Sequence, residues 1–208
     1  MRVLALAASL RRGSLNRKLI QVAARIAREE GAQVDLAEFR AFEMPLYDGD
    51  LNEAQGLPPG AQALQRHVEA ADALLLAAPE YNYSIAGPLK NAIDWVSRAR
   101  PMPWRGKSVY LMSASPSPMG GIRGLWQTRI PLEGCGALVF PDMFALPHAD
   151  TAFDDAGRLG DAQLAGKLSR DVVGFLRLAE AVEPICANPA NREIARALED
   201  ESEIQPPA

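Results

Sequence analysis

The sequence feature that most constrains the fold is an unbroken apolar run, Ala-Leu-Leu-Leu-Ala-Ala, at residues 73–78. A strand with one face in water alternates apolar and polar residues, whereas an interior strand of a parallel sheet is covered on both faces and shows no alternation. Four more short runs have strand character, at residues 3–8, 33–38, 108–113 and 137–140. The pattern therefore predicts a parallel sheet of five strands, with residues 73–78 in its interior.

Segments with helical periodicity fill the gaps between these runs, as crossover connections of a parallel sheet require. In the first segment, Leu19, Ala23 and Ile26 lie on one apolar stripe, and Gly31 follows as a stop signal. Pro131 should bend the fourth helix or end it early. We expect helices at residues 15–30, 58–71, 87–100, 120–134 and 161–182.

Right-handed crossovers leave few ways to order five parallel strands, and the doubly wound order 2-1-3-4-5 is a natural one. It produces a three-layer α/β sandwich, with helices on both faces of the sheet. The strand order reverses beside the first strand, which opens a crevice at the carboxyl ends of strands 1 and 3. Ligand-binding residues should therefore lie in the loops after strands 1, 3 and 4.

Length and charge exclude several classes of protein. The chain has 208 residues, 48% of them apolar, and a net charge of −4, which fits one globular domain and argues against a nucleic-acid surface. The apolar run at residues 3–8 is shorter than the h-region of a signal peptide, and no run is long enough to cross a bilayer. Cys135 and Cys186 form no C-x-x-C pair, and His67 and His148 lack metal-ligand spacing. We expect a soluble cytoplasmic protein without a metal.

The chain end differs in composition from the rest. We expect one domain over residues 1–184, closed by Pro184, and an acidic extension over residues 185–208. From residue 188 onward the net charge is −3, from Arg192, Arg196, Glu193, Glu199, Asp200, Glu201 and Glu203. Residues 191–198 can form one amphipathic helix or belong to a frayed, solvated extension, and both alternatives stay open.

The loop after the first strand is rich in groups that bind anions. Residues 9–16 read Ser-Leu-Arg-Arg-Gly-Ser-Leu-Asn and enter directly into a helix, whose first N–H groups have no intrahelical partner. The hydroxyls of Ser9 and Ser14 and the guanidinium of Arg11 can bind a phosphate there, and Asn16 adds an amide. Alternatively, Ser14 or Asn16 merely caps the helix, which accounts for only one of them. The loop matches neither G-x-x-x-x-G-K-[ST], the phosphate loop of nucleoside triphosphatases, nor G-x-G-x-x-G, the dinucleotide-binding pattern of Rossmann enzymes. Both classes of protein are therefore disfavoured.

Two more loops reach the same edge of the expected sheet. The loop after strand 3 reads Pro-Glu-Tyr-Asn-Tyr-Ser-Ile-Ala-Gly-Pro-Leu-Lys-Asn-Ala-Ile-Asp-Trp over residues 79–95, and it is polar and aromatic before a helix begins. The loop after strand 4 reads Ser-Pro-Ser-Pro-Met-Gly-Gly over residues 115–121. Together the three loops predict a phosphate cradle, an aromatic wall and a glycine-rich edge around one crevice.

These segments closely resemble the NADPH-dependent FMN reductase family, a flavodoxin-like group that includes bacterial quinone, chromate and azo-dye reductases. The first loop matches G-S-L-R-x-G-S-x-N with Ala8 in place of the leading glycine, and the third matches S-P-x-x-x-G-G. The second matches P-E-Y-N-x-S-x-P-G-x-L-K-N-x-x-D-W, except that residues 86–88 read Ala-Gly-Pro where the family has Pro-Gly-x. That shift changes the entrance to the following helix next to Ser84. The resemblance covers about the first 180 residues and implies a flavodoxin-like, doubly wound sheet.

The resemblance also implies which residues bind FMN. They are Ser9, Arg11, Ser14, Leu15 and Asn16 at the phosphate, Pro79, Glu80, Tyr81, Asn82, Tyr83 and Ser84 along the isoalloxazine, mostly through backbone groups, and Ser115, Gly120 and Gly121 at its other side. The flavin carries the redox chemistry, so no catalytic acid, base or nucleophile is expected from the protein.

The implied activity is ping-pong hydride transfer from NAD(P)H to FMN N5 and on to quinones, flavins or other xenobiotic acceptors. Arg12, Arg17 and Arg123 are the candidates for a contact with the 2′-phosphate of NADPH. A homodimer or a dimer of dimers is implied, with residues 87–100 at the interface. We expect Asp94 and Trp95 to serve packing or subunit contact rather than catalysis, and Trp104 and Trp126 to lie in the core or an interface. The alternative is a flavodoxin-like electron carrier or flavin-binding regulatory protein with little turnover.

Overall fold

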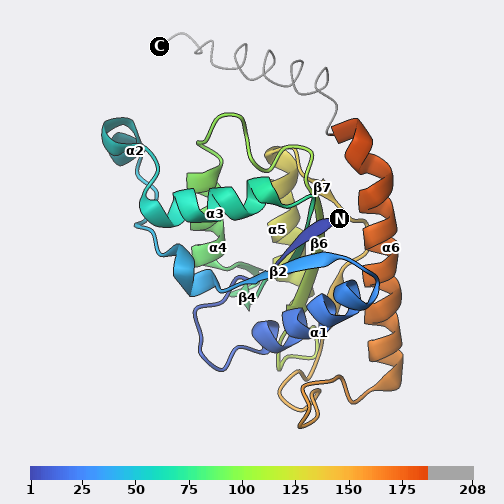
Figure 1. The fold of residues 1–208 in the computed structure, drawn as a ribbon. Helices are drawn as coiled ribbons and strands as arrows, with labels where there is room; N and C mark the ends of the chain where they lie inside the picture. The colour runs from blue at the N-terminus through green and yellow to red at the C-terminus, as the bar shows by residue number, and fades with distance from the viewer. Residues whose placement is uncertain (187–208) are drawn as a thin grey trace.

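The computed structural model of the chain describes residues 1–186, which form a parallel sheet with helices on both faces (Figure 1). The strand order is β2-β1-β3-β6-β7, and the short strand β8 also pairs with β6. Neighbouring strands of this sheet run parallel. The strands are β1 (Arg2–Ala7), β2 (Gln33–Ala37), β3 (Ala73–Ala77), β6 (Ser108–Ala114), β7 (Leu138–Val139) and β8 (Phe144–Leu146).

Two apolar clusters, one on each face of the sheet, form the core. Successive residues of β1 divide between them, because Cβ atoms alternate along a strand: Val3 and Ala5 pack with α1 (Leu15–Glu29) and α6 (Ala162–Cys186). Leu4 and Leu6 pack against the opposite layer. That layer contains α3 (Pro59–Ala70), α4 (Gly87–Val96) and α5 (Ile122–Gly134). The predicted three-layer, flavodoxin-like α/β fold is confirmed.

The strand predicted from the unbroken apolar run has the expected environment. Every residue of β3 is buried, and β3 lies between β1 and β6 in the sheet. A strand covered on both faces loses the alternation of a half-exposed strand, as the sequence indicated. The strand order β2-β1-β3-β6-β7 also agrees with the predicted order 2-1-3-4-5.

The predicted fifth strand at residues 137–140 is wrong in extent, because two short strands take its place. Phe140 still donates its N–H to the Val109 carbonyl at 2.8 Å, but Pro141 follows and has no N–H to continue the ladder. The chain rejoins β6 at β8, where Met112 pairs with Phe144. The interruption leaves six strands in the sheet instead of five.

Helix ends differ from the predictions in three places. Pro131 was expected to bend α5 or to end it early. An early end is wrong, since the helix continues to Gly134, and the proline removes only one N–H in the last turn. The helix predicted at residues 87–100 stops at Val96, because the following turn tightens: Arg98 donates to Trp95 and Ala99 to Val96. At the other end, α6 passes Pro184 and extends to Cys186.

The remaining elements are short and were not predicted. They are the 3₁₀ helix η1 (Phe39–Phe42), the helix α2 (Gly49–Gln55), and an antiparallel hairpin of β4 (Glu80–Tyr81) and β5 (Ser84–Ile85). The helix α2 buries none of its residues and stands away from the sheet at the upper left of Figure 1. The expected helix at residues 191–198 and the acidic extension lie outside the described residues, and the boundary at residue 184 stays a prediction.

Within residues 1–186, no helix is long and apolar enough to cross a membrane, and no cluster of three or more metal-ligating side chains occurs. Both cysteines are free.

Candidate active site

The three loops singled out in the sequence leave the sheet at one edge. Ala8 donates its N–H to the Ala77 carbonyl at 2.9 Å, and Ala78 donates to the Met112 carbonyl at 2.8 Å. The ends of β1, β3 and β6 therefore lie side by side at the same level. This is the carboxyl edge of a doubly wound sheet, next to the point where the strand order reverses.

The two serines of the first loop are buried, and their hydroxyls already stabilise the loop. The Ser14 hydroxyl caps α1 by accepting from the Arg17 N–H at 3.3 Å, so the capping alternative holds for this residue. The Ser9 hydroxyl accepts from the Arg11 N–H at 3.4 Å. A hydroxyl that accepts one bond keeps a proton to donate, so capping and phosphate binding are compatible.

Asn16 has a different role from the one expected of its side chain. Its amide Nδ2 donates to the Ala114 carbonyl and its Oδ1 accepts from the Ala114 N–H, both at 3.0 Å, and the residue is buried. The side-chain amide therefore fastens the first loop to the end of β6 and is not free to bind a phosphate. Only the main-chain N–H of Asn16 is free to bind a phosphate.

The start of α1 fits the phosphate of FMN. The N–H groups of Leu15 and Asn16 begin the helix and donate no hydrogen bond within residues 1–186. A side chain placed on Gly13 would meet nothing within 4 Å, so the loop backbone is open to a ligand. Arg11 and Arg12 are exposed, and neither forms an ion pair within the part of the chain described. Free N–H groups, a helix N-terminus and unpaired guanidinium groups are the donors that a phosphate requires.

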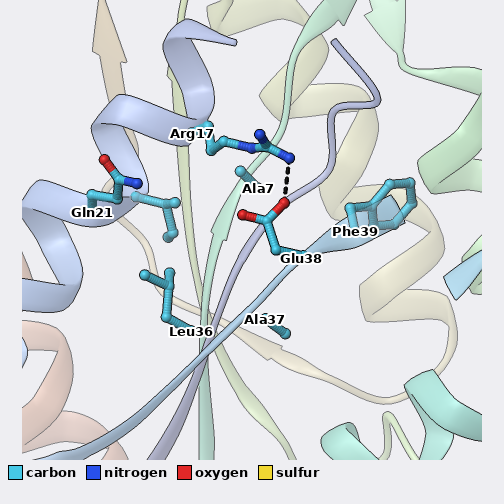
Figure 2. A pocket seen from close by; sticks show the side chains of 8 residues that line it. Ala7, Arg17, Gln21, Leu36, Ala37, Glu38 and Phe39 are labelled. Carbon is cyan, nitrogen blue, oxygen red and sulfur yellow. Dashed lines mark hydrogen bonds and ion pairs between the residues drawn. The ribbon is translucent and has the colours of Figure 1, made fainter. Parts of the chain in front are cut away.

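Two further arginines lie beside this loop and are already bonded. Figure 2 shows Arg17 reaching from α1 to the carboxylate of Glu38, directly after β2, with which it forms an ion pair. The pair borders a small hollow whose other lining residues are Ala7, Ile20, Gln21, Leu36, Ala37 and Phe39. Arg40 of η1 donates to the Leu10 carbonyl and so supports the loop from outside. Arg40 is remote in sequence from the loop motif, so no sequence signal pointed to its role.

The loop after β3 is a two-residue hairpin. Asn82 and Tyr83 form its turn with φ of 50° and 66°, which places both in the left-handed region that a type I′ turn requires. Asparagine adopts this conformation readily, whereas a tyrosine does so at a cost. Tyr81 and Tyr83 are 49% and 68% exposed, so the predicted aromatic wall is open to solvent.

The carboxylate of Glu80 does not face the open side of the hairpin. The carboxylate accepts from the Gly124 N–H at 3.0 Å and from Arg123 Nε at 3.1 Å, and the side chain is 10% exposed. The guanidinium of Arg123 also lies 3.9 Å from the Tyr83 ring centroid. Any contact of Glu80 with a flavin would therefore come from its backbone, as the resemblance implies.

The glycine-rich loop after β6 is shaped by packing. Gly120 and Gly121 have φ of 60° and 89°. A Cβ on Gly120 would lie 2.8 Å from the backbone of Ala145, and a Cβ on Gly121 would lie 2.2 Å from the Ser113 hydroxyl. The hydroxyl of Ser115 is bonded within the loop, to Ser117 at 3.2 Å. The pattern is thus explained by close contact with the sheet, and its backbone still borders the same edge as the other two loops.

The end of the second motif stabilises a distant loop. Asn91 accepts from the Tyr47 N–H at 2.7 Å and donates to the Pro45 carbonyl at 2.8 Å, and the buried Trp95 donates to the same carbonyl. Asp94 pairs with Lys90 on the surface of α4. The contacts of the buried Trp95 agree with a packing role, whereas the Asp94 side chain forms an ion pair on the surface, and a subunit contact there stays a prediction.

Trp104 is buried, as expected of a core residue, whereas Trp126 is 54% exposed. His67 contacts Asp35 at 2.5 Å on the surface. Neither of these features lies in the three loops.

Comparison with known proteins decides the family. The family model of NADPH-dependent FMN reductases matches residues 1–151 of the chain, which include all three loops. The chain belongs to this family. The resemblance inferred from the three motifs is therefore confirmed, and the protein is an NAD(P)H-dependent oxidoreductase of the FMN reductase family.

Related proteins carry names that agree with this family. The chain is 39% identical over 168 residues to an NAD(P)H-dependent FMN reductase of Pseudomonas aeruginosa, covering 77% of this chain and 85% of the relative. It is 40% identical over 195 residues to an NAD(P)H:quinone oxidoreductase of Solanum tuberosum, covering 89% and 96% of the two chains.

Solved structures agree as well. The flavoenzyme NAD(P)H:(acceptor) oxidoreductase FerB of Paracoccus denitrificans superposes with a TM-score of 0.75 at 31% identity, covering 86% of this chain and 97% of that one. An archaeal flavodoxin superposes with a TM-score of 0.55 at 11% identity, covering 88% of this chain and 99% of that one, which shows the shared fold alone.

Proposed function

We propose that the protein reduces quinones or related planar acceptors with electrons from NAD(P)H, by ping-pong kinetics at an FMN held along the carboxyl edge of the sheet. The observation that carries the proposal is the start of α1, where the free N–H groups of Leu15 and Asn16 directly follow a loop with two buried serines and two exposed arginines. When bound, FMN supplies the redox chemistry, accepting hydride from NAD(P)H and delivering it to the acceptor.

The residues of the chain bind and orient. The N–H groups of Leu15 and Asn16, the Ser9 and Ser14 hydroxyls and the Arg11 guanidinium hold the phosphate. The hairpin backbone from Glu80 to Ser84 would hold one side of the ring system, and the loop that contains Gly120 would hold the other. This arrangement aligns the two substrates in turn against one exposed face of the cofactor.

Coenzyme preference depends on which guanidinium reaches the 2′-phosphate of NADPH. Arg17 is paired with Glu38, and Arg123 with Glu80. Arg12 is exposed and has no ion pair within residues 1–186. Of the three candidates, Arg12 is therefore the one whose guanidinium is available, and we assign the contact to it.

The proposed assembly is a homodimer or a dimer of dimers in the cytoplasm. Two observations support it: large apolar side chains are exposed on α5 and beside α4, and both cysteines are unpaired, as is usual in a reducing compartment.

One spectroscopic experiment tests the activity. The purified protein is mixed with FMN under anaerobic conditions, and its visible absorption is recorded before and after one equivalent of NADPH and then after benzoquinone. We expect FMN to bind, to bleach with NADPH and to recover its absorption with the quinone. If FMN binds but stays oxidised with both NADPH and NADH, the protein is an electron carrier or a regulatory protein. If FMN does not bind, the assignment of the phosphate site is wrong.

A further inference from the structure

A chain of contacts connects the tip of the hairpin with the start of α5. One oxygen of the Glu80 carboxylate accepts from the Gly124 N–H at 3.0 Å, and the other lies 2.9 Å from Nη2 and 3.1 Å from Nε of Arg123. The guanidinium then covers the ring of Tyr83, with 3.9 Å from its central carbon to the ring centroid. Arg123 therefore contacts the first strand of the hairpin through Glu80 and its turn through Tyr83.

The backbone packs closely along the same contact. Gly124 follows Arg123 in the first turn of α5, and a Cβ placed there would lie 2.9 Å from the Glu80 Cα and 3.1 Å from the Ser84 carbonyl. Helix and hairpin thus touch through main-chain atoms on both strands. The hairpin is fixed on α5 at its base by glycine packing and at its tip by the Arg123 side chain.

Tyr83 needs such support because of its backbone conformation. A φ of 66° is unfavourable for an aromatic residue, and the side chain is 68% exposed, so burial contributes little to holding it. A guanidinium over the ring face provides an attraction that a surface tyrosine otherwise lacks. The largely buried Glu80 carboxylate bonds two nitrogen atoms of the guanidinium and so keeps it over the Tyr83 ring.

We infer that Arg123 is a positioning residue for flavin binding: through Glu80 and Tyr83 it holds the β4–β5 hairpin in one conformation against α5, so that the wall for the isoalloxazine exists before the cofactor arrives. A preformed wall raises affinity because no hairpin ordering accompanies binding. Arg123 is consequently not the ligand of the NADPH 2′-phosphate. The inference rests on the proposed function only in taking the hairpin as part of the flavin site.

The first test uses the protein without flavin. Hydrogen exchange of a peptide that covers residues 79–86 is compared in the wild type, Arg123→Met and Glu80→Gln, with Arg2→Met as the matched control. Arg2 also pairs with a carboxylate, that of Asp72, but at the opposite edge of the sheet. We expect exchange in this peptide to be about tenfold faster in the two hairpin variants and unchanged in the control. Equal exchange in all four proteins would overturn the inference, whatever the cofactor is.

The second test separates positioning from phosphate binding. FMN and riboflavin affinities are measured by fluorescence quenching well below each variant's melting temperature. We expect Arg123→Met to weaken both ligands by a similar factor, about tenfold, because the affected surface faces the ring shared by both. The NADPH-to-NADH ratio of KM should not change. Selective loss of FMN, or of NADPH relative to NADH, would instead make Arg123 a phosphate ligand and contradict the inference.

Two more variants distinguish the contacts from general stability. Tyr83→Ala keeps the ion pair and removes the ring that the guanidinium covers, and we expect it to weaken both flavins with no change in melting temperature. Arg123→Lys keeps the charge but loses the planar fork, so it should restore only part of the affinity. Full rescue by lysine would mean that charge alone acts, and would contradict the proposed hold of the planar guanidinium on both Glu80 and Tyr83. If the wild type binds no FMN, the proposed function fails, while the exchange experiment still decides whether Arg123 holds the hairpin.

Discussion

The residues of the first loop divide into those that the fold already uses and those left for a ligand. Ser14 caps a helix, and Asn16 fastens the loop to β6. Leu15 contributes only a free N–H, and Arg11 contributes an exposed guanidinium. A single motif therefore contains both residues that shape the proposed phosphate site and residues proposed as its ligands, and the two roles can be separated by substitution.

Arg11→Ala tests the ligand role. Because riboflavin lacks the phosphate, the change should weaken FMN by about tenfold and leave riboflavin unaffected, the magnitude expected for one partly solvated charge-assisted hydrogen bond. Dissociation constants from flavin fluorescence quenching measure both. Arg2→Met, at the other edge of the sheet, is the control. Equal weakening of the two ligands would remove Arg11 from the phosphate site.

Asn16→Ala tests the structural role. The change leaves the N–H and carbonyl of Ala114 without partners in a buried place, and each unsatisfied group costs about 1–3 kcal/mol. We expect the free energy of unfolding of the flavin-free protein to fall by about 2–4 kcal/mol in urea titrations. Gln55→Ala, on the exposed surface of α2, should change it by less than about 0.5 kcal/mol. Similar stability of both variants would show that the Asn16 contacts are dispensable.

At the scale of elements, the glycine-rich loop fits closely against the sheet. Gly121→Ala would place a Cβ 2.2 Å from the Ser113 hydroxyl at a φ of 89°. Overpacking of about 1–3 kcal/mol then adds to a backbone cost of about 1 kcal/mol. Gly157→Ala is the matched control, because its φ is 69° but nothing lies within 4 Å. In urea titrations, the free energy of unfolding of Gly157→Ala should fall only by the backbone cost. An equal fall in both variants would mean that the loop relaxes freely away from Ser113.

The sequence predicted the elements whose signal is local. Apolar runs located the β1, β2, β3 and β6 strands to within one residue at either end, and the observed order of the sheet is the doubly wound one chosen from the few that right-handed crossovers allow. It did not predict the two-residue strands of the hairpin, because pairs so short have no periodicity to detect. The interruption between β7 and β8 had a visible cause in Pro141, which the prediction did not use.

The site was predictable in location and only partly in detail. Motif residues gave the three loops, and topology brought them to one edge. The partners of Asn16 and Glu80 lie 98 and 44 residues away, so no pattern in the sequence connects them. Both residues were assigned to the flavin site, Asn16 by its amide and Glu80 mostly by its backbone, and the structure uses the polar groups of both side chains to join elements. Polar residues in a binding motif can thus be present for the scaffold of the site as much as for the ligand.

At the scale of the whole molecule, several of the large apolar side chains exposed within residues 1–186 lie on α5 and on the loop beside α4. Trp126 and Ile130 are 54% and 63% exposed and lie four residues apart on α5, so they share one side of the helix. Leu46 is 82% exposed on the loop that Asn91 fastens to α4. The helices α4 and α5 are neighbours in the same layer. A second copy of the chain is the partner that we propose for this face, as part of the expected dimer.

Replacing Trp126 and Ile130 together by glutamate should therefore dissociate the assembly into monomers, because two charges in an apolar contact oppose burial. Sedimentation velocity measures the state directly, and circular dichroism verifies that the fold is retained. Leu178→Glu provides the control, since this leucine is 40% exposed but belongs to α6 in the opposite helix layer. The double variant should sediment as a monomer while the control keeps the size of the wild type. A monomeric wild type would refute the dimer itself, whereas an unaltered double variant would place the contact on another face.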